Sequence, residues 1–172
     1  MNSDNLVKIN NFFKNRLIEF FGTLLIVFSI FVFLSIVSYS PGDPNFIYTP
    51  ESIDIKNFGG FYGSVISDLL LQSVGFISFF IVLNLFYWGV KLIIDKKIEN
   101  FLLRIFFTLI YVIFGTTFVN IFYYDSFWLI DNGNSGFIGR IIKENFYSLI
   151  NINENKYLFF SLLSISFLFF VL

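Results

Sequence analysis

Two carboxylates lie within or beside long apolar runs, and these are the first candidates for chemistry. Glu19 lies near the start of one run, and Asp68 stands directly before another. A carboxylate inside a membrane is by default a functional candidate, because it can carry protons or ions. Arg16 precedes Glu19 by three residues, so we expect an ion pair on one helix face rather than a proton carrier. We expect Asp68 to lie in the first turn of a helix, where negative charge is stabilised, and an ion-pathway role is the alternative.

Residue types that catalyse reactions or hold metals are scarce. The chain has no Cys and no His, which excludes thiol nucleophiles, imidazole bases, disulfides and structural zinc sites within these residues. It has no Gly-x-x-x-x-Gly-Lys-[Ser/Thr] motif to bind nucleotide phosphates. Its carboxylates are scattered over several loops rather than paired for acid–base catalysis. We therefore predict no active site, cofactor site or metal site within these residues.

The composition predicts an integral membrane protein. Hydrophobic residues make up 56% of the chain and charged residues only 13%, whereas a soluble domain has about 25% charged residues. The mean hydropathy is +0.78. The net charge of −1 argues against nucleic-acid binding by this segment. We attribute the 28 Phe residues to the base composition of the genome rather than to an aromatic functional surface.

Four apolar runs are the elements that must position any polar group. The uncharged run Leu69–Val90 is close to the roughly 20 residues that a helix needs to cross a bilayer. We predict an all-α membrane protein with a cytoplasmic N-terminal segment over 1–16 and a four-span membrane domain over 17–172. The expected spans are about 17–38, 69–91, 101–122 and 157–172. The fourth run reaches only about 24 Å as a helix, so we expect the chain to be a fragment cut inside that span.

Basic residues predict the orientation of the spans. Seven lie in the N-terminal segment or around the link between the second and third spans: Lys8, Lys14, Arg16, Lys91, Lys96, Lys97 and Arg104. Four lie in the two longer loops: Lys56, Arg140, Lys143 and Lys156. Because cytoplasmic loops carry the excess of Lys and Arg, we predict that the N-terminus and the end of the fourth span are both cytoplasmic.

Three further patterns describe the connections and the span interiors. The stretch from Gly136 to Ile150 is amphipathic, which predicts a helix in the membrane interface before the fourth span, with a short water-facing helix as the alternative. Gly59 and Gly63 have a spacing that allows close helix approach, although a flexible re-entry at the interface explains them equally well. We expect Gln72 and Asn84 to form helix-to-helix hydrogen bonds.

The chain around the first long loop carries a composite pattern. It runs Ser38-Tyr39-Ser40-Pro41-Gly42-Asp43-Pro44, then Asn57-Phe58-Gly59-Gly60, Gly63, Asp68-Leu69-Leu70-Leu71-Gln72 and Gly75. In this order and spacing it resembles the four-helix membrane domain at the N-terminus of bacterial FtsK/SpoIIIE DNA translocases, and the resemblance is concentrated in residues 38–91. The signature residues that carry it are Ser38, Tyr39, Ser40, Pro41, Asp43, Pro44, Gly59, Gly63, Asp68 and Gln72.

The resemblance implies a membrane anchor in the bacterial inner membrane at the division septum. The parent protein would carry a cytoplasmic RecA-like ATPase that hexamerises and moves chromosomal DNA during cell division. ATP, magnesium and DNA would then bind to that motor, whereas this segment would contact lipid and other division proteins. Two alternatives stay open: a subunit of a small transporter or channel, which would need a polar pathway through the bundle, and a free-standing septal membrane scaffold.

Overall fold

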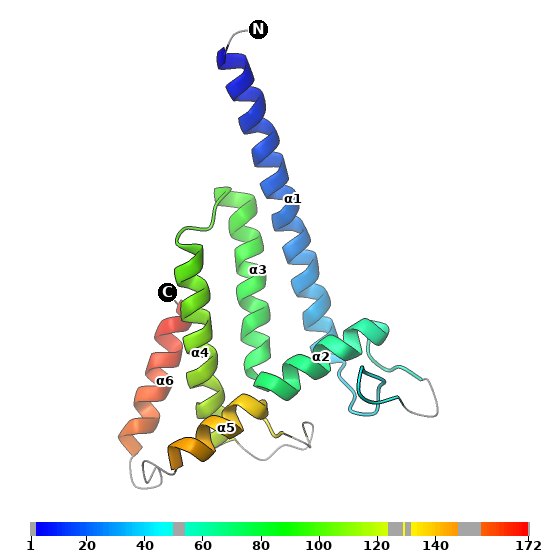
Figure 1. Cartoon of the computed structure of the whole chain (residues 1–172), viewed down its shortest axis with the longest axis vertical. Coiled ribbons are helices and arrows are strands. Elements are labelled where there is room, and N and C mark those ends of the chain that lie inside the picture. Colours follow the sequence, from blue (N-terminus) through cyan, green and yellow to red (C-terminus); the bar gives the residue numbers. More distant parts are fainter. Residues whose placement is uncertain (1–2, 50–53, 124–128, 130–131, 148–155, 172) are drawn as a thin grey trace.

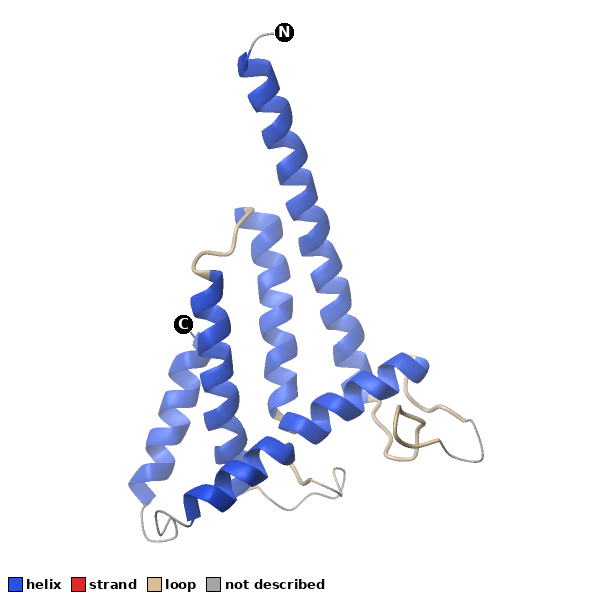
Figure 2. Cartoon of the chain, viewed as in Figure 1, coloured by secondary structure: helices blue, strands red, loops and turns tan. Residues whose placement is uncertain are grey.

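The computed structural model of the chain describes residues 3–49, 54–123, 129, 132–147 and 156–171. Within these residues all regular secondary structure is helical, which confirms the predicted all-α class (Figure 2). The helices in chain order are α1 (Ser3–Val37), α2 (Gly60–Val74), α3 (Ile77–Asp95), α4 (Phe101–Phe122), α5 (Gly136–Tyr147) and α6 (Lys156–Val171).

Four helices run along a bundle, and α2 and α5 lie across one end of it (Figure 1). We call this end the loop end, and the opposite end, where residues 96–100 connect α3 to α4, the link end. α1 packs mainly against α3, α4 packs against α6 and α5, and α2 bridges α1 and α5. α3 and α4 make few contacts with each other although they are consecutive. The long helices therefore form two pairs that are joined across the loop end.

The helix predicted to run unbroken over 69–91 is in fact two helices, and this prediction was wrong. α2 ends at Val74 and α3 begins at Ile77. Gly75 between them has φ +60° and ψ −138°, a conformation that residues with a Cβ atom rarely adopt. Apolar residues continue through the turn, so hydropathy gave no sign of it. The apolar helix that can span is Ile77–Asp95, and residues 69–74 belong to the crossing helix α2.

Among the described residues, three helices are long and apolar enough to cross a membrane: Lys8–Val37, Ile77–Asp95 and Phe101–Phe122. α6 contains a shorter apolar stretch, Phe160–Phe169. Large apolar side chains on these helices face outward, and Leu102, for example, is 81% exposed. Such extensive apolar exposure marks a surface that lipid or another protein covers.

α1 is longer than the first predicted span. The helix begins at Ser3 rather than near residue 17, and its first turns project beyond the link end (Figure 1). Between these first turns and the loop end, α1 approaches α3 closely at a pair of glycines. A Cβ atom on Gly22 would lie 2.8 Å from the carbonyl oxygen of Gly89, and one on Gly89 would lie 2.9 Å from the carbonyl oxygen of Gly22. Small residues therefore set the distance between these two helices, as is usual for helices packed in membranes.

Candidate functional site

A buried carboxylate closes the loop that follows α1. Asp43 is only 3% exposed, and it accepts hydrogen bonds from the backbone N–H groups of Lys56 (3.1 Å) and Asn57 (2.8 Å). Hydrogen bonds to an ionised carboxylate are stronger than those between neutral groups, so Asp43 holds the two ends of the loop together. Pro44 beside it is buried, whereas Pro41 is exposed. The Pro-Gly-Asp-Pro sequence therefore has a structural role, which is to fix the conformation of the loop.

Asn57 connects this loop to both neighbouring helices. Its side-chain amide donates to the carbonyl oxygen of Ser35 on α1 (2.8 Å) and to Ser67 Oγ on α2 (3.2 Å). Its side-chain oxygen accepts the backbone N–H of Gly59 (2.9 Å). Sequence reasoning placed Asn57 in the family pattern but gave it no role, because its partners are distant in the chain.

Ser38 and Ser40 shape the first turn of the loop. The Ser38 hydroxyl donates to the carbonyl oxygen of Leu34 (2.7 Å) and accepts the backbone N–H of Phe58 (2.9 Å). The carbonyl oxygen of Ser40 accepts the backbone N–H of Asp43 (3.1 Å). Together these bonds tie the end of α1 to the start of α2.

Gly59 and Gly63 lie where α2 meets α1. A Cβ atom on Gly59 would lie 2.6 Å from Ser35 Oγ, and one on Gly63 would lie 2.8 Å from the same atom. The structure therefore favours close helix approach over a flexible re-entry. Gly59 itself directly precedes α2 rather than lying within it.

Asp68 does not cap a helix, and that prediction was wrong. It lies in the interior of α2, where its two carboxylate oxygens accept hydrogen bonds from the Tyr39 hydroxyl (3.1 Å) and the Asn45 side-chain amide (2.9 Å). One turn further along α2, Gln72 donates to the Tyr39 hydroxyl oxygen (3.2 Å) and accepts from the Asn132 side chain (2.7 Å). Gln72 thus binds connecting segments rather than another helix.

These polar residues help to line a pocket at the loop end. We call Tyr39, Asn45, Asp68, Gln72 and Asn132 the loop-end cluster. The pocket has a volume of about 620 Å³, and its remaining lining residues are Pro41, Phe46, Ile47, Tyr48, Val65 and Leu69. Within the described residues, no Lys or Arg forms an ion pair with Asp68. The pocket therefore combines mostly apolar walls with one carboxylate that has only neutral partners.

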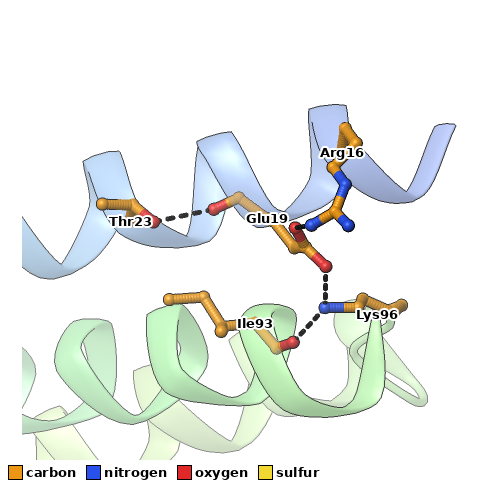
Figure 3. A network of polar contacts seen from close by, with 5 residues as sticks. All are labelled: Arg16, Glu19, Thr23, Ile93 and Lys96. Carbon is orange, nitrogen blue, oxygen red and sulfur yellow. Dashed lines mark hydrogen bonds and ion pairs between the residues drawn. The ribbon is translucent and has the colours of Figure 1, made fainter. Parts of the chain in front are cut away.

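A second, charged cluster lies at the link end (Figure 3). Glu19 on α1 forms ion pairs with Arg16 and with Lys96, which directly follows α3. Lys96 also donates to the carbonyl oxygen of Ile93. The predicted pair of Arg16 and Glu19 is confirmed. The contribution of Lys96 was missed, because it depends on how α1 packs against α3.

Three more basic residues of the predicted cytoplasmic set, Lys91, Lys97 and Arg104, also lie at the link end. Lys91 lies 3.9 Å from Asp95, and Lys97 lies 2.7 Å from Glu99. The hydrogen bond from Lys97 lowers the pKa of the Glu99 carboxyl. Arg104 donates through Nε to the carbonyl oxygen of Glu99 (3.1 Å). Lys14 lies exposed on the projecting part of α1.

The two clusters position helices rather than assemble reactive groups. Within the described residues, no three acidic side chains come together as a metal site would require. Glu19 and Asp68 lie at opposite ends of the bundle, so they cannot divide acid and base roles between them. Asn84 is half-buried on α3, and no hydrogen bond joins it to another helix within the described residues. The geometry favours a site for binding and anchoring.

Comparison with known proteins places this arrangement among membrane domains of DNA translocases. The family described as the 4TM region of DNA translocase FtsK/SpoIIIE matches residues 14–172. A protein of Azospirillum brasilense named DNA translocase FtsK is 30% identical over 87 residues, which are 50% of this chain. The matched part covers only 14% of that relative's length. No solved structure matches the chain.

Proposed function

Because this chain belongs to the family of FtsK/SpoIIIE four-span membrane domains, we propose that it anchors a cytoplasmic ATP-driven DNA motor in the bacterial inner membrane. The observation that carries this function is the family match over residues 14–172. The parent protein would bear a hexameric motor that binds ATP, magnesium and DNA and that segregates chromosomes during division. The membrane domain would place this motor at the division septum and contact lipid and other division proteins.

The distribution of basic residues supports a cytoplasmic link end. Arg16, Lys91, Lys96, Lys97 and Arg104 gather there, and Lys8 and Lys14 lie on the part of α1 that projects beyond it. Both the start of α1 and the end of α6 point toward this end (Figure 1). If the link end, with its excess of Lys and Arg, faces the cytoplasm, a motor that followed the fourth span would also lie in the cytoplasm, where the chromosome is.

The exposed apolar and charged side chains of α5 support a position for this helix in the membrane interface at the loop end. Phe137 and Ile141 are 48% and 39% exposed, while Arg140, Lys143 and Glu144 supply charge on the same short helix. The Arg140 guanidinium lies 5.8 Å from the centre of the Phe137 ring. A helix with exposed apolar and charged side chains suits the boundary between lipid and water.

Septal placement is tested with a fluorescent protein fused after Leu172 and expressed in dividing bacteria. We expect a fluorescent band at the division site, coincident with a marker of the septum. An unrelated multi-span protein with the same fusion is the control, and it should label the whole envelope. Uniform envelope fluorescence from both fusions would contradict septal anchoring.

The transporter alternative makes a different prediction. It requires that polar groups such as Asp68 and Asn84 serve a solute pathway, so Asp68→Asn and Asn84→Ala should abolish flux in proteoliposomes. The anchor function predicts no solute flux above that of empty liposomes and no dependence on either residue. Flux that disappears in both variants would reject the anchor in favour of transport.

A further inference from the structure

α2 has a second apolar face that the bundle does not cover. Gly63, Ser67, Leu71 and Val74 face the bundle and are buried. On the opposite side lie Phe61, Tyr62, Val65 and Leu69. Val65 is three or four residues from each of the other three, so they form one stripe along the helix. Tyr62 is 73% exposed and Leu69 is 63% exposed. We call these four residues the α2 stripe.

The tip of the loop after α1 extends this apolar surface. Phe46 is 79% exposed and Ile47 is 96% exposed. The Phe46 ring packs edge-on against Phe61 of the stripe, with ring centres 5.8 Å apart. Two apolar side chains at a loop tip, continuous with an apolar helix face, form the kind of patch that a soluble surface avoids.

The pocket of the loop-end cluster lies along this surface. Leu69 of the stripe and Ile47 of the loop tip both line it, and Asp68 and Gln72 form its polar wall. The oxygens of Asp68 each accept one hydrogen bond from a neutral group, and a carboxylate oxygen has a second lone pair that can accept another. The pocket thus offers a negative charge next to an apolar track.

The position of α2 relative to the bilayer indicates that the partner of this surface is a lipid. α2 is joined to the spanning helix α3 only through Gly75 and Phe76, so it is held at the end of the span. Lipid head groups and the first carbons of their acyl chains lie at that depth. We propose that the pocket binds the primary ammonium head group of a phospholipid such as phosphatidylethanolamine, whose acyl chains lie along the α2 stripe.

The selectivity of the site follows from hydrogen bonding. A primary ammonium donates three hydrogen bonds and can pair with the Asp68 carboxylate. The quaternary ammonium of phosphatidylcholine has no N–H to donate, and phosphatidylglycerol has no cation. The site should therefore prefer phosphatidylethanolamine over both lipids by about tenfold in affinity.

Native mass spectrometry of the purified chain in micelles tests this preference. Each of the three lipids, with identical acyl chains, is added alone, and the fraction of protein that retains one lipid is measured. Asp68→Asn should abolish the tenfold preference, so that the variant retains the three lipids equally. Asp54→Asn is the matched control, because Asp54 is an exposed carboxylate that does not line the pocket, and it should leave the preference unchanged.

A second variant keeps the test decisive if Asp68→Asn fails to fold. Leu69→Lys places an ammonium of the protein beside Asp68 at an exposed position, so it should also remove the preference. Leu102→Lys, at an exposed position of α4, is its control. Equal retention of all three lipids by the unsubstituted chain, or a preference that survives Leu69→Lys, would overturn the lipid site. A measurement in micelles has no sidedness, so neither result bears on orientation or septal placement.

Discussion

The two halves of the bundle share an arrangement but differ in what holds them together. α1, α2 and α3 form a helix along the bundle, a crossing helix and a second helix along the bundle, and α4, α5 and α6 repeat that order (Figure 1). In the first half, side chains from the loop after α1 bond to both α1 and α2. Among the described residues of the second half, α4 meets α6 through aromatic side chains, as in the contact of Phe107 with Phe169, whose ring centres lie 5.1 Å apart, and the buried Asn120 donates to Ser135 Oγ.

This difference explains where the sequence pattern is recognisable. Hydrogen bonds need particular side chains at particular positions. Asp43, Asn57 and Asp68 therefore give the sequence of the first half a specific pattern. Apolar packing is satisfied by many side chains of similar volume. The pattern that was recognisable in the sequence accordingly lies in residues 38–91, whereas the family match extends over residues 14–172. We therefore expect the first half to depend on specific groups and the second half on general packing.

The largest effect is expected at the junction of the two halves. A Cβ atom on Gly75 would overlap the backbone of Asn134, in addition to the strain of its positive φ. Gly75→Ala should therefore lower the free energy of unfolding by about 3 kcal/mol or more in micelles. Gly60→Ala is the control, since Gly60 also has a positive φ but a Cβ there would meet no described atom within 4 Å. It should cost only about 1 kcal/mol, and equal losses would show that packing at the junction is unimportant.

The next largest effect compares one buried Asn from each half. Asn57→Ala removes two donated hydrogen bonds and one accepted bond, and it should cost about 2–4 kcal/mol of unfolding free energy. Asn120 on α4 donates to Ser135 Oγ (2.6 Å), but its Oδ1 has no partner among the described residues. Asn120→Ala should therefore cost about 1 kcal/mol. Denaturant unfolding in micelles measures both, and a larger loss for Asn120→Ala would reverse the comparison.

Sequence reasoning succeeded where local pattern determines structure. Hydropathy located α1, α4 and α6 and the apolar part of α3, and residues 136–147 of the predicted amphipathic stretch are helical. The pair of Arg16 and Glu19 follows from helix periodicity alone. Residues 148–150, the predicted end of the amphipathic helix, lie outside the described residues.

It failed where structure depends on contacts between distant segments. At the break beside Gly75, the Phe76 N–H donates to the carbonyl oxygen of Asn134, and hydropathy does not record that contact. The role of Asp68 was mistaken because Tyr39 and Asn45 reach it only after the loop has folded back over α2. The pocket, formed by residues from three separate stretches of the chain, had no sequence signal of its own.

A moderate effect is expected where α1 meets α3. Gly22→Ala would place a Cβ atom 2.8 Å from the carbonyl oxygen of Gly89, so the helices must separate. We expect a loss of about 1–3 kcal/mol in unfolding free energy, measured in micelles. Gly42→Ala, in a loop position with no described atom within 4 Å of the added Cβ, is the control and should change stability little. No difference between the two variants would mean that this helix contact is dispensable.

The smallest effect is expected at the link-end cluster. Glu19 and Lys96 are both partly exposed, so solvent and salt screen their attraction. Glu19→Gln should lower the unfolding temperature slightly at low salt, and 1 M salt should remove the difference. A double-mutant cycle with Lys96→Met isolates the pair, and a loss that persists in high salt would show that Glu19 acts through something other than this ion pair.

The orientation of the bundle in the membrane can be tested directly, because the chain has no Cys. Single Cys residues are introduced at two exposed positions, Asp54→Cys at the loop end and Lys97→Cys at the link end. Intact cells are then treated with a membrane-impermeant maleimide, before and after permeabilisation of the inner membrane. We predict that Asp54→Cys is labelled in both conditions and Lys97→Cys only after permeabilisation. Labelling of Lys97→Cys in intact cells would place the link end on the periplasmic side of the membrane and would contradict the proposed function as an anchor for a cytoplasmic motor.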